Sequence, residues 1–237
     1  GATVALGGAL QRGAYLALPR SLPHGVGPLA PSVAYLVGYS AGDGGWRPRG
    51  ARPLGGLQWS EQDPEQKQNI ITACQEGFGV TPVTHERSPT SLLYTSDVAM
   101  VERFRADFHE ALGPQNGRRV PGRIFLADAS AVREFLRGAF DAEGSSQSKK
   151  VSLTVTSREL VEGIALLLRR FGIIATIIKR PGASLERLPT WSIHLGGSQA
   201  LRFAEQVGFG MPRKQTQLLS SGSGPSRIRG GDYVPVD

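Results

Sequence analysis

The sequence predicts an α+β protein made of two pseudo-symmetric halves, each with the element order αββαββα. Residues 36–44 (LVGYSAGDG) and residues 136–144 (LRGAFDAEG) are two versions of one apolar helical segment, and each ends in a carboxylate followed by glycine. The same landmarks follow both copies in the same order. The whole unit, and not the short motif alone, is therefore expected to be duplicated.

The landmarks after each motif predict the rest of the unit. An apolar run in a polar stretch indicates a strand, and a helix ending in Phe-Gly-Val or Phe-Gly-Ile follows it. Two more strand-like runs and a closing helix complete each half. The most regular of these helices is expected at residues 158–170, where an apolar stripe is formed by Leu160, Val161, Ile164, Leu167 and Leu168.

Composition limits the class of protein. A formal charge of +7 and a pI near 10.0 favour a polyanionic partner such as nucleic acid, although high solubility is an alternative explanation. Cys74 is the only cysteine, which excludes an internal disulfide and a cysteine zinc cluster, and we expect it in a buried helix. Because no apolar run reaches the roughly 18 residues of a membrane span, we expect a soluble, cytoplasmic protein without membrane contact.

Each motif has small residues four positions apart, namely Gly38 and Gly42 in the first and Gly138 and Ala142 in the second. Residues at this spacing lie on one face of a helix, and the lack of bulk lets two helix axes approach closely. The two motif helices are therefore expected to pack together at the centre. This contact would bring Asp43 and Glu143, at the helix C-terminal ends, to one place.

Two carboxylates about 5 Å apart repel each other by roughly 3 kcal/mol at an effective dielectric constant of 20. A helix C-terminus also disfavours negative charge, so a cation must offset both effects. Oxygen ligands without His or Cys beside them favour Mg²⁺. Carboxylates around hard cations suit phosphodiester hydrolysis, whereas the alternative is that both acids are ordinary helix ends facing water.

Residues 36–44 and 136–144 resemble the two LAGLIDADG motifs of the monomeric homing endonucleases, in the subgroup carried within inteins. The resemblance covers roughly residues 30–215. It implies a site-specific endonuclease that makes a metal-dependent double-strand break at a long, pseudo-palindromic target. The two β-sheets would form a saddle over double-stranded DNA, and the chain would act as a monomer that is associated with the nucleoid when bound to DNA.

The resemblance also implies roles for individual residues. The last acid of each motif, here Asp43 or Glu143, would bind the metal, with the backbone carbonyls of Gly42 and Ala142 as secondary ligands. Mg²⁺ is the expected cofactor, and Mn²⁺ or Ca²⁺ could replace it for binding. The family uses basic or polar residues to position water. The candidates for this catalytic role beside the two acids are Gln62 and Lys214, and a solvated surface role is the alternative for each.

Candidate DNA contacts come from alternating strands and from clustered basic residues. The strand at 151–156 places Ser152, Thr154 and Thr156 on its polar face, and the strand at 191–195 does the same for Ser192 and His194. A polar face is often only solvated, but nearby basic residues favour contact with phosphates and base edges. These basic residues are Arg47, Arg49, Arg52, Lys149, Lys150, Lys179, Arg180 and Arg187.

The flanking sequences also resemble intein sequence, at residues 10–20 and 230–236. Because the chain starts with Gly1 and ends in Asp237, splicing chemistry is expected to be absent. We expect five segments: an intein-like flanking segment (1–28), a first LAGLIDADG half (29–113), a linker (114–122), a second LAGLIDADG half (123–215), and a flexible connector with an intein-like tail (216–237).

Two rival functions are compatible with parts of the sequence. Residues 38–42 match G-x-S-x-G, the nucleophile elbow of α/β-hydrolases, but that elbow needs a helix directly after it. The Gly-, Pro- and Arg-rich stretch at 43–50 cannot start one, and the second copy has no serine. The stronger rival is a cleavage-inactive LAGLIDADG protein that binds nucleic acid as an RNA-splicing factor or a DNA-binding regulator. The presence of both Asp43 and Glu143 favours the active enzyme.

Overall fold

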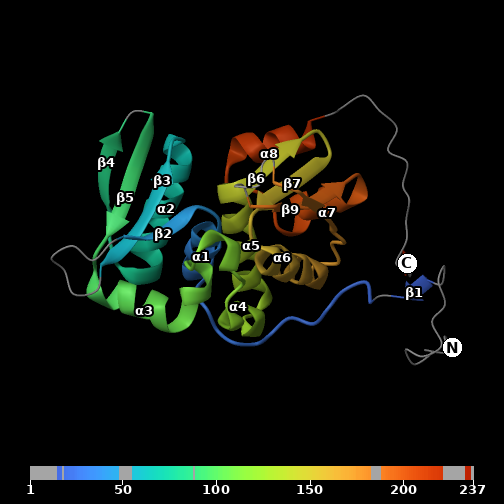
Figure 1. The fold of residues 1–237 in the computed structure, drawn as a ribbon, viewed down its shortest axis with the longest axis horizontal. Coiled ribbons are helices and arrows are strands. Elements are labelled where there is room, and N and C mark those ends of the chain that lie inside the picture. Colours follow the sequence, from blue (N-terminus) through green and yellow to red (C-terminus); the bar gives the residue numbers. More distant parts are fainter. Residues whose placement is uncertain are drawn as a thin grey trace.

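The computed structural model describes residues 15–17, 19–47, 55–87, 89–182, 188–220 and 233–235, and it confirms two halves with the order αββαββα (Figure 1). The first half consists of α1 (Pro31–Asp43), β2 (Gly44–Arg47), β3 (Gly56–Glu61), α2 (Pro64–Phe78), β4 (Val83–Arg87), β5 (Thr90–Thr95) and α3 (Val98–Phe108). The second half consists of α5 (Ala129–Glu143), β6 (Gly144–Gln147), β7 (Lys150–Val155), α6 (Arg158–Arg170), β8 (Thr176–Arg180), β9 (Thr190–Gly196) and α7 (Ser198–Gln206).

Shorter elements connect and flank the two halves. The connection contains two 3₁₀ turns, η2 (His109–Ala111) and η3 (Gln115–Gly117), and the short helix α4 (Gly122–Leu126). Helix α8 (Pro212–Leu219) follows the second half, and strand β1 (Tyr15–Ala17) pairs antiparallel with β10 (Tyr233–Pro235). Within the described ranges, no helix is both long enough and apolar enough to cross a membrane.

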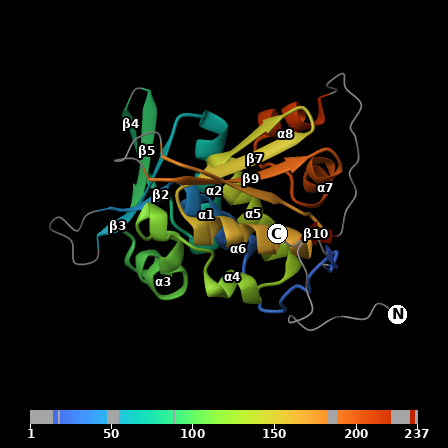
Figure 2. The ribbon, with the colours of Figure 1, turned by 45° about the vertical axis from the view of Figure 1, so that its right-hand side comes forward.

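The two four-stranded sheets have the same topology, β2-β3-β5-β4 and β6-β7-β9-β8, and all neighbouring strands are antiparallel. Each motif helix runs directly into the first strand of its sheet. Gly44 is paired with Trp59, and Gly144 is paired with Leu153 at the equivalent position. The sheets lie on opposite sides of the central pair α1 and α5 (Figures 1 and 2).

Helices α1 and α5 pack backbone to backbone because glycines line their contact. A Cβ atom on Gly38 would lie 1.9 Å from the carbonyl oxygen of Phe135, and one on Gly138 would lie 2.1 Å from that of Tyr35. Both distances are far inside van der Waals contact, so no residue larger than glycine fits at either position without moving a backbone. The small residues four apart therefore serve the helix contact that the sequence predicts.

Apolar side chains surround this contact and fill each half. The predicted stripe on α6 is confirmed, since each of its five members is buried: Leu160, Val161, Ile164, Leu167 and Leu168. Cys74 is buried in α2, as expected. The helices α2 and α6 end at the predicted Phe-Gly landmarks, where Gly79 and Gly172 have φ angles of 68° that glycine adopts readily.

Ser40 has a structural position in α1, which rejects the hydrolase reading of the first motif. The residue is fully buried, and its hydroxyl accepts a hydrogen bond of 2.8 Å from the indole nitrogen of Trp59. The motif is a helix followed by a strand, the reverse of the order that a nucleophile elbow needs. Trp59 itself is buried and Trp46 is partly buried against the core, so both rings serve packing.

Replacing Gly38 with alanine should lower the free energy of unfolding by about 3 kcal/mol or more, because the new methyl group collides with backbone atoms of α5. Gly122→Ala is the matched control, since a Cβ atom there meets nothing within 4 Å. Urea unfolding should show a large loss for the first variant and a change of less than about 1 kcal/mol for the second. Equal stability of the two variants would contradict the close helix contact.

Candidate active site

The site begins where the two motif helices end. Asp43 is the last residue of α1 and Glu143 is the last residue of α5. A Cβ atom on Gly42 would lie 2.7 Å from the Cβ atom of Ala142 and 2.8 Å from the Cγ atom of Glu143. The side chain of Glu143 therefore lies against the residue that precedes Asp43. Because each half supplies one of these acids, the pair lies at the meeting point of the two halves.

Electrostatic interactions connect these two acids to a third, Glu61. Desolvation, aided by the negative charge of Asp43, raises the pKa of Glu143. Desolvation and then the charge of Glu61 raise the pKa of Asp43, and the positive charges of Arg118 and Lys214 act in the opposite direction. The meeting point thus concentrates negative charge, and two cations offset it.

Glu61 is held firmly at the end of β3. Its Oε2 atom accepts a hydrogen bond of 2.6 Å from the hydroxyl of Tyr39, and its Oε1 atom accepts bonds of 2.7 and 2.8 Å from the backbone N–H groups of Gln62 and Asp63. Gln62, and not Glu61, was the residue predicted from the sequence at this place. Strand alternation could have identified Glu61, because it lies two residues after the buried Trp59 and therefore shares its face of the sheet.

Arg118 is the cation at the end of α1, and it comes from the connection that was expected to be only a linker. Its Nη1 atom donates hydrogen bonds to the carbonyls of Ala41, at 3.1 Å, and Gly42, and its Nη2 atom donates one of 2.6 Å to Gly44. Burial lowers the pKa of Arg118, and the charges of Glu143 and Asp43 oppose that shift. The guanidinium group therefore neutralises helix-end carbonyls and acids together.

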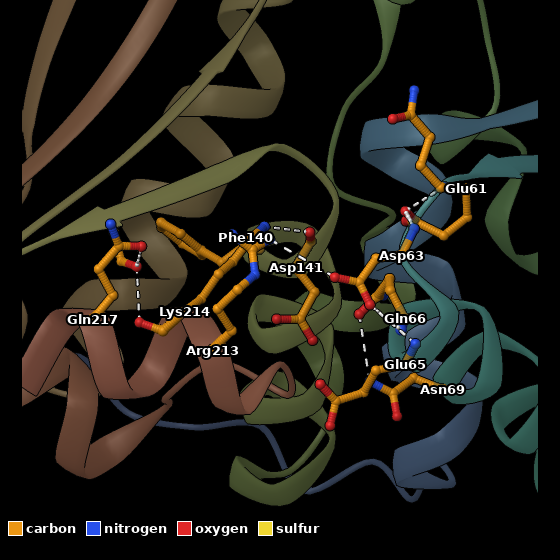
Figure 3. Close-up of polar contacts among 12 residues, drawn as sticks. Glu61, Asp63, Glu65, Gln66, Asn69, Phe140, Asp141, Arg213, Lys214 and Gln217 are labelled. Atoms are coloured by element: carbon orange, nitrogen blue, oxygen red, sulfur yellow. Dashed lines mark hydrogen bonds and ion pairs between the residues drawn. The ribbon is translucent and has the colours of Figure 1, made fainter. Parts of the chain in front are cut away.

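Lys214 is the corresponding cation at the end of α5, where it neutralises helix-end carbonyls (Figure 3). Its Nζ atom donates hydrogen bonds to the carbonyls of Asp141, at 2.6 Å, and Phe140, at 3.3 Å. Burial lowers its pKa, which the charges of Asp141, Glu61 and Glu143 oppose. Lys214 lies on α8, which follows the last helix of the second half, just as the Arg118 segment follows the last helix of the first. The two cations are thus equivalent under the pseudo-twofold relation.

The donor set suits a divalent ion. A cavity of about 190 Å³ has Gly42, Arg118, Glu143, Thr154 and Thr156 among its lining residues, and it is large enough for several waters. Within the described part of the chain, no group of three or more His, Cys, Asp and Glu side chains could hold a metal. Mg²⁺ usually takes one or two carboxylates and keeps waters or substrate oxygens, so two acids are sufficient.

The other residues predicted to belong to the site are Gln62, Ala142 and Gly42. Gln62 is exposed directly after β3, and its backbone N–H donates to Glu61. Ala142 is half-buried beside Gly42. The carbonyl oxygen of Gly42, a predicted metal ligand, already accepts a hydrogen bond from Arg118. A metal ion at that oxygen would have to share it with the guanidinium group or displace the group.

Several of the residues expected to contact DNA are exposed to solvent on β7 and β8. Lys150 is exposed at the start of β7, and Lys179 and Arg180 are exposed on β8. Lys149 is half-buried in the turn before β7, where its φ angle is 53°. Arg47 is half-buried at the end of β2, with its guanidinium carbon 3.6 Å from the centre of the Tyr94 ring.

The polar face of β7 and β9 differs from its expected form at one residue. Ser152 lies opposite His194, and Thr154 lies opposite Ser192. Ser192 is fully buried, and its hydroxyl lies 2.8 Å from that of Thr154, so the expected exposure of Ser192 is wrong. Its cross-strand neighbours, Thr154 on β7 and Ile178 on β8, flank this small side chain. Thr154 is exposed, whereas the half-buried members are Ser152, Thr156 and His194. The candidates outside the described residues are Arg49, Arg52 and Arg187.

Known proteins share this fold and parts of this sequence. Residues 130–208 match the family model of the LAGLIDADG-like domain. The crystal structure of I-DmoI in complex with DNA and Mn is similar with a TM-score of 0.60 and 19% identity, covering 76% of this chain and 98% of that one. The described structure therefore shares the fold of I-DmoI, and residues 130–208 of its second half match the LAGLIDADG-like domain.

The curated relatives are much longer than this chain. The replication factor C small subunit of Methanocaldococcus jannaschii is 25% identical over 215 residues, which is 89% of this chain and 11% of the relative. The DNA polymerase of Thermococcus hydrothermalis is 27% identical over 228 residues, which is 90% of this chain and 13% of the relative. The chain thus matches a segment of about one eighth of each relative or less.

Arg118→Met should lower the free energy of unfolding by about 3 kcal/mol in the absence of divalent metal, because it leaves two acids and several helix-end carbonyls without their cation. Arg119→Met removes the same charge from an exposed neighbour whose ion pair with Glu159 is 3.8 Å long. That control should lose less than about 1 kcal/mol. Thermal and urea unfolding measure the difference, and similar losses in both variants would contradict the role given to Arg118.

Proposed function

We propose that this chain is a homing endonuclease that makes a metal-dependent double-strand break at a long, pseudo-palindromic DNA target. The observation that supports it is the meeting of Asp43 and Glu143, one acid from each half, between two sheets of the same topology. A double-strand break needs one reaction on each DNA strand. A pseudo-twofold pair of acids supplies one acid for each of these two reactions.

The target would be double-stranded DNA, with one half-site on each sheet. The net charge of +7 attracts phosphates, and the second sheet presents Lys150, Lys179 and Arg180 to solvent. Since both halves belong to one chain, a monomer can cover both half-sites. The halves differ in sequence, so the two half-sites need not be identical, and the target is an imperfect palindrome.

Asp43 and Glu143 would hold the metal, Mg²⁺ in the proposal, with help from the carbonyls of Gly42 and Ala142. The bound ion supplies positive charge that stabilises the attacking and leaving oxygens of phosphodiester hydrolysis. Lys214 interacts electrostatically with Glu61 and Glu143, and its charge can stabilise negative charge on a phosphate that enters the site. Gln62, exposed beside Glu61, can hydrogen-bond a water molecule at the open side of β3.

The proposed setting is an intein. The named relatives are a replication factor and a DNA polymerase, and the chain matches only a short part of each. Strands β1 and β10 pair antiparallel, which brings residues 15–17 and 233–235 side by side. A segment with this pairing can be inserted into a host domain with little disturbance, because the host chain leaves and re-enters at one place.

Asp43→Asn and Glu143→Gln remove one charge each and nearly preserve shape. Cleavage of plasmid DNA carrying the target should fall at least about 10²-fold in each variant, while affinity for the target holds or increases because an acid facing phosphate is lost. Ca²⁺, which is larger and less demanding in geometry, should support binding with little cutting. Cleavage time courses beside gel-shift titrations measure both properties.

Glu65→Gln is the control for these variants, because Glu65 is an exposed acid in the first turn of α2. It should cleave like the parent protein. Parent rates in Asp43→Asn or Glu143→Gln would reject the assignment of that acid. Binding without cleavage in the parent protein, with every divalent metal tested, would instead support the cleavage-inactive alternative.

Binding in Ca²⁺ should weaken steeply with salt, because cationic side chains on the sheets release counterions from phosphates. Five phosphate contacts would give a slope of about −4.5 for the logarithm of affinity against the logarithm of salt concentration. Lys179→Gln combined with Arg180→Gln should make the slope shallower by about 1 to 2 units. A slope near zero would reject the basic saddle.

A further inference from the structure

A pocket rich in arginine lies among the helices of the second half and not on its sheet. It is a pocket of about 500 Å³ between the segment at residues 20–24, the start of α5, the end of α6 and the end of α7. No strand residue lines it, and it shares no residue with the cavity beside Glu143. The charged and ring-bearing residues in its lining are Arg20, His24, Arg133, Arg170, Phe171, Arg202 and Glu205.

The charge of this pocket is strongly positive. Four guanidinium groups face a single carboxylate, that of Glu205. In the described part of the chain, none of Arg133, Arg170 and Arg202 forms an ion pair with a carboxylate. Clustered arginines repel one another unless an anion lies between them. Among the residues that line the pocket, Glu205 is the only acid, so the lining carries an excess of positive charge.

Backbone carbonyls hold two of the guanidinium groups in place. The Nε atom of Arg133 donates a hydrogen bond of 2.7 Å to the carbonyl of Gln206, and the Nη1 atom of Arg202 donates one of 2.6 Å to the carbonyl of Gly172. Each bond uses one nitrogen and leaves other N–H groups of the same fork available. A guanidinium group that is fixed in this way loses little freedom when it binds an anion.

Two buried nitrogen atoms in the lining have no hydrogen-bond partner among the described residues. They are the Nη1 atom of Arg170, which is a donor, and the Nδ1 atom of His24, which donates in the tautomer that carries its proton there. His24 packs edge-on against Phe171, with ring centres 4.8 Å apart, so its ring is held at the pocket wall. Buried polar atoms normally have partners, and a ligand with several acceptor oxygens would satisfy both of these.

We propose that this pocket binds a phosphate group. Phosphate has several acceptor oxygens and a negative charge, which matches arginine forks better than a single carboxylate does. The volume exceeds that of one phosphate, so the group can belong to a larger molecule. It can come from a free phosphorylated compound or from a nucleic-acid strand that passes behind the second half. The site does not depend on the acids at the motif helices.

The test uses the full chain in EDTA and two probes, inorganic pyrophosphate and a short single-stranded oligonucleotide without the target sequence. Isothermal titration calorimetry should show binding of at least one probe. Arg170→Gln should weaken that binding at least 10-fold. It should leave folding intact, because among the described residues the guanidinium group of Arg170 forms no ion pair and its Nη1 atom makes no hydrogen bond. Arg158→Gln is the control on the same helix, since Arg158 is exposed and paired with Glu162 at 2.7 Å, and it should change affinity less than 2-fold.

Glu205→Gln gives an opposite and independent readout, because removal of the one acid in the lining should tighten binding about 3-fold or more. Binding of pyrophosphate alone identifies a free phosphorylated ligand, and tighter binding of the oligonucleotide that is equally sensitive to Arg170→Gln identifies a strand. The proposal is overturned if neither probe binds. It is also overturned if Arg170→Gln and Arg158→Gln bind alike, or if only Lys179→Gln and Arg180→Gln weaken binding.

Discussion

The close contact between the backbones of α1 and α5 determines where the rest of the molecule lies. Gly38 and Gly138 leave no room for a side chain, so the helix axes approach until backbone meets backbone. The first strand of each sheet starts at the residue after its helix, and the position of both sheets therefore follows from the helix pair. A larger residue at the contact would separate the helices and also move the two sheets apart.

This contact has an electrostatic consequence that the fold must offset. It places two helix C-termini and two acids at one point, and Arg118 and Lys214 each neutralise one helix end. The symmetry is incomplete, because Glu61 follows Trp59 by two residues while Val155 follows Leu153 by two, at the equivalent place in the second sheet. The two sides of the site thus differ by one acid, and under the proposed function the two DNA strands would meet unequal surroundings.

The sequence predicted the features that depend on local pattern. The duplication, the small-residue spacing and the acid-glycine ending identified the helix pair, the order of elements and the positions of Asp43 and Glu143. The residues that the sequence did not reveal depend on contacts between segments that are far apart in the chain. Arg118 reaches α1 from a segment without regular pattern. Glu61 differs from the selected Gln62 by one strand position, and Ser192 is buried by neighbouring strands that its own alternation does not reveal.

Whether the motif helices create a metal site can be measured directly by anomalous diffraction from crystals soaked in Mn²⁺. We predict a strong peak within coordinating distance of the carboxylates of both Asp43 and Glu143. We also predict that the guanidinium group of Arg118 will share the carbonyl of Gly42 with the ion or move away from it. Absence of a peak between the two acids at saturating Mn²⁺ would contradict the account, as would a peak bound only elsewhere on the protein.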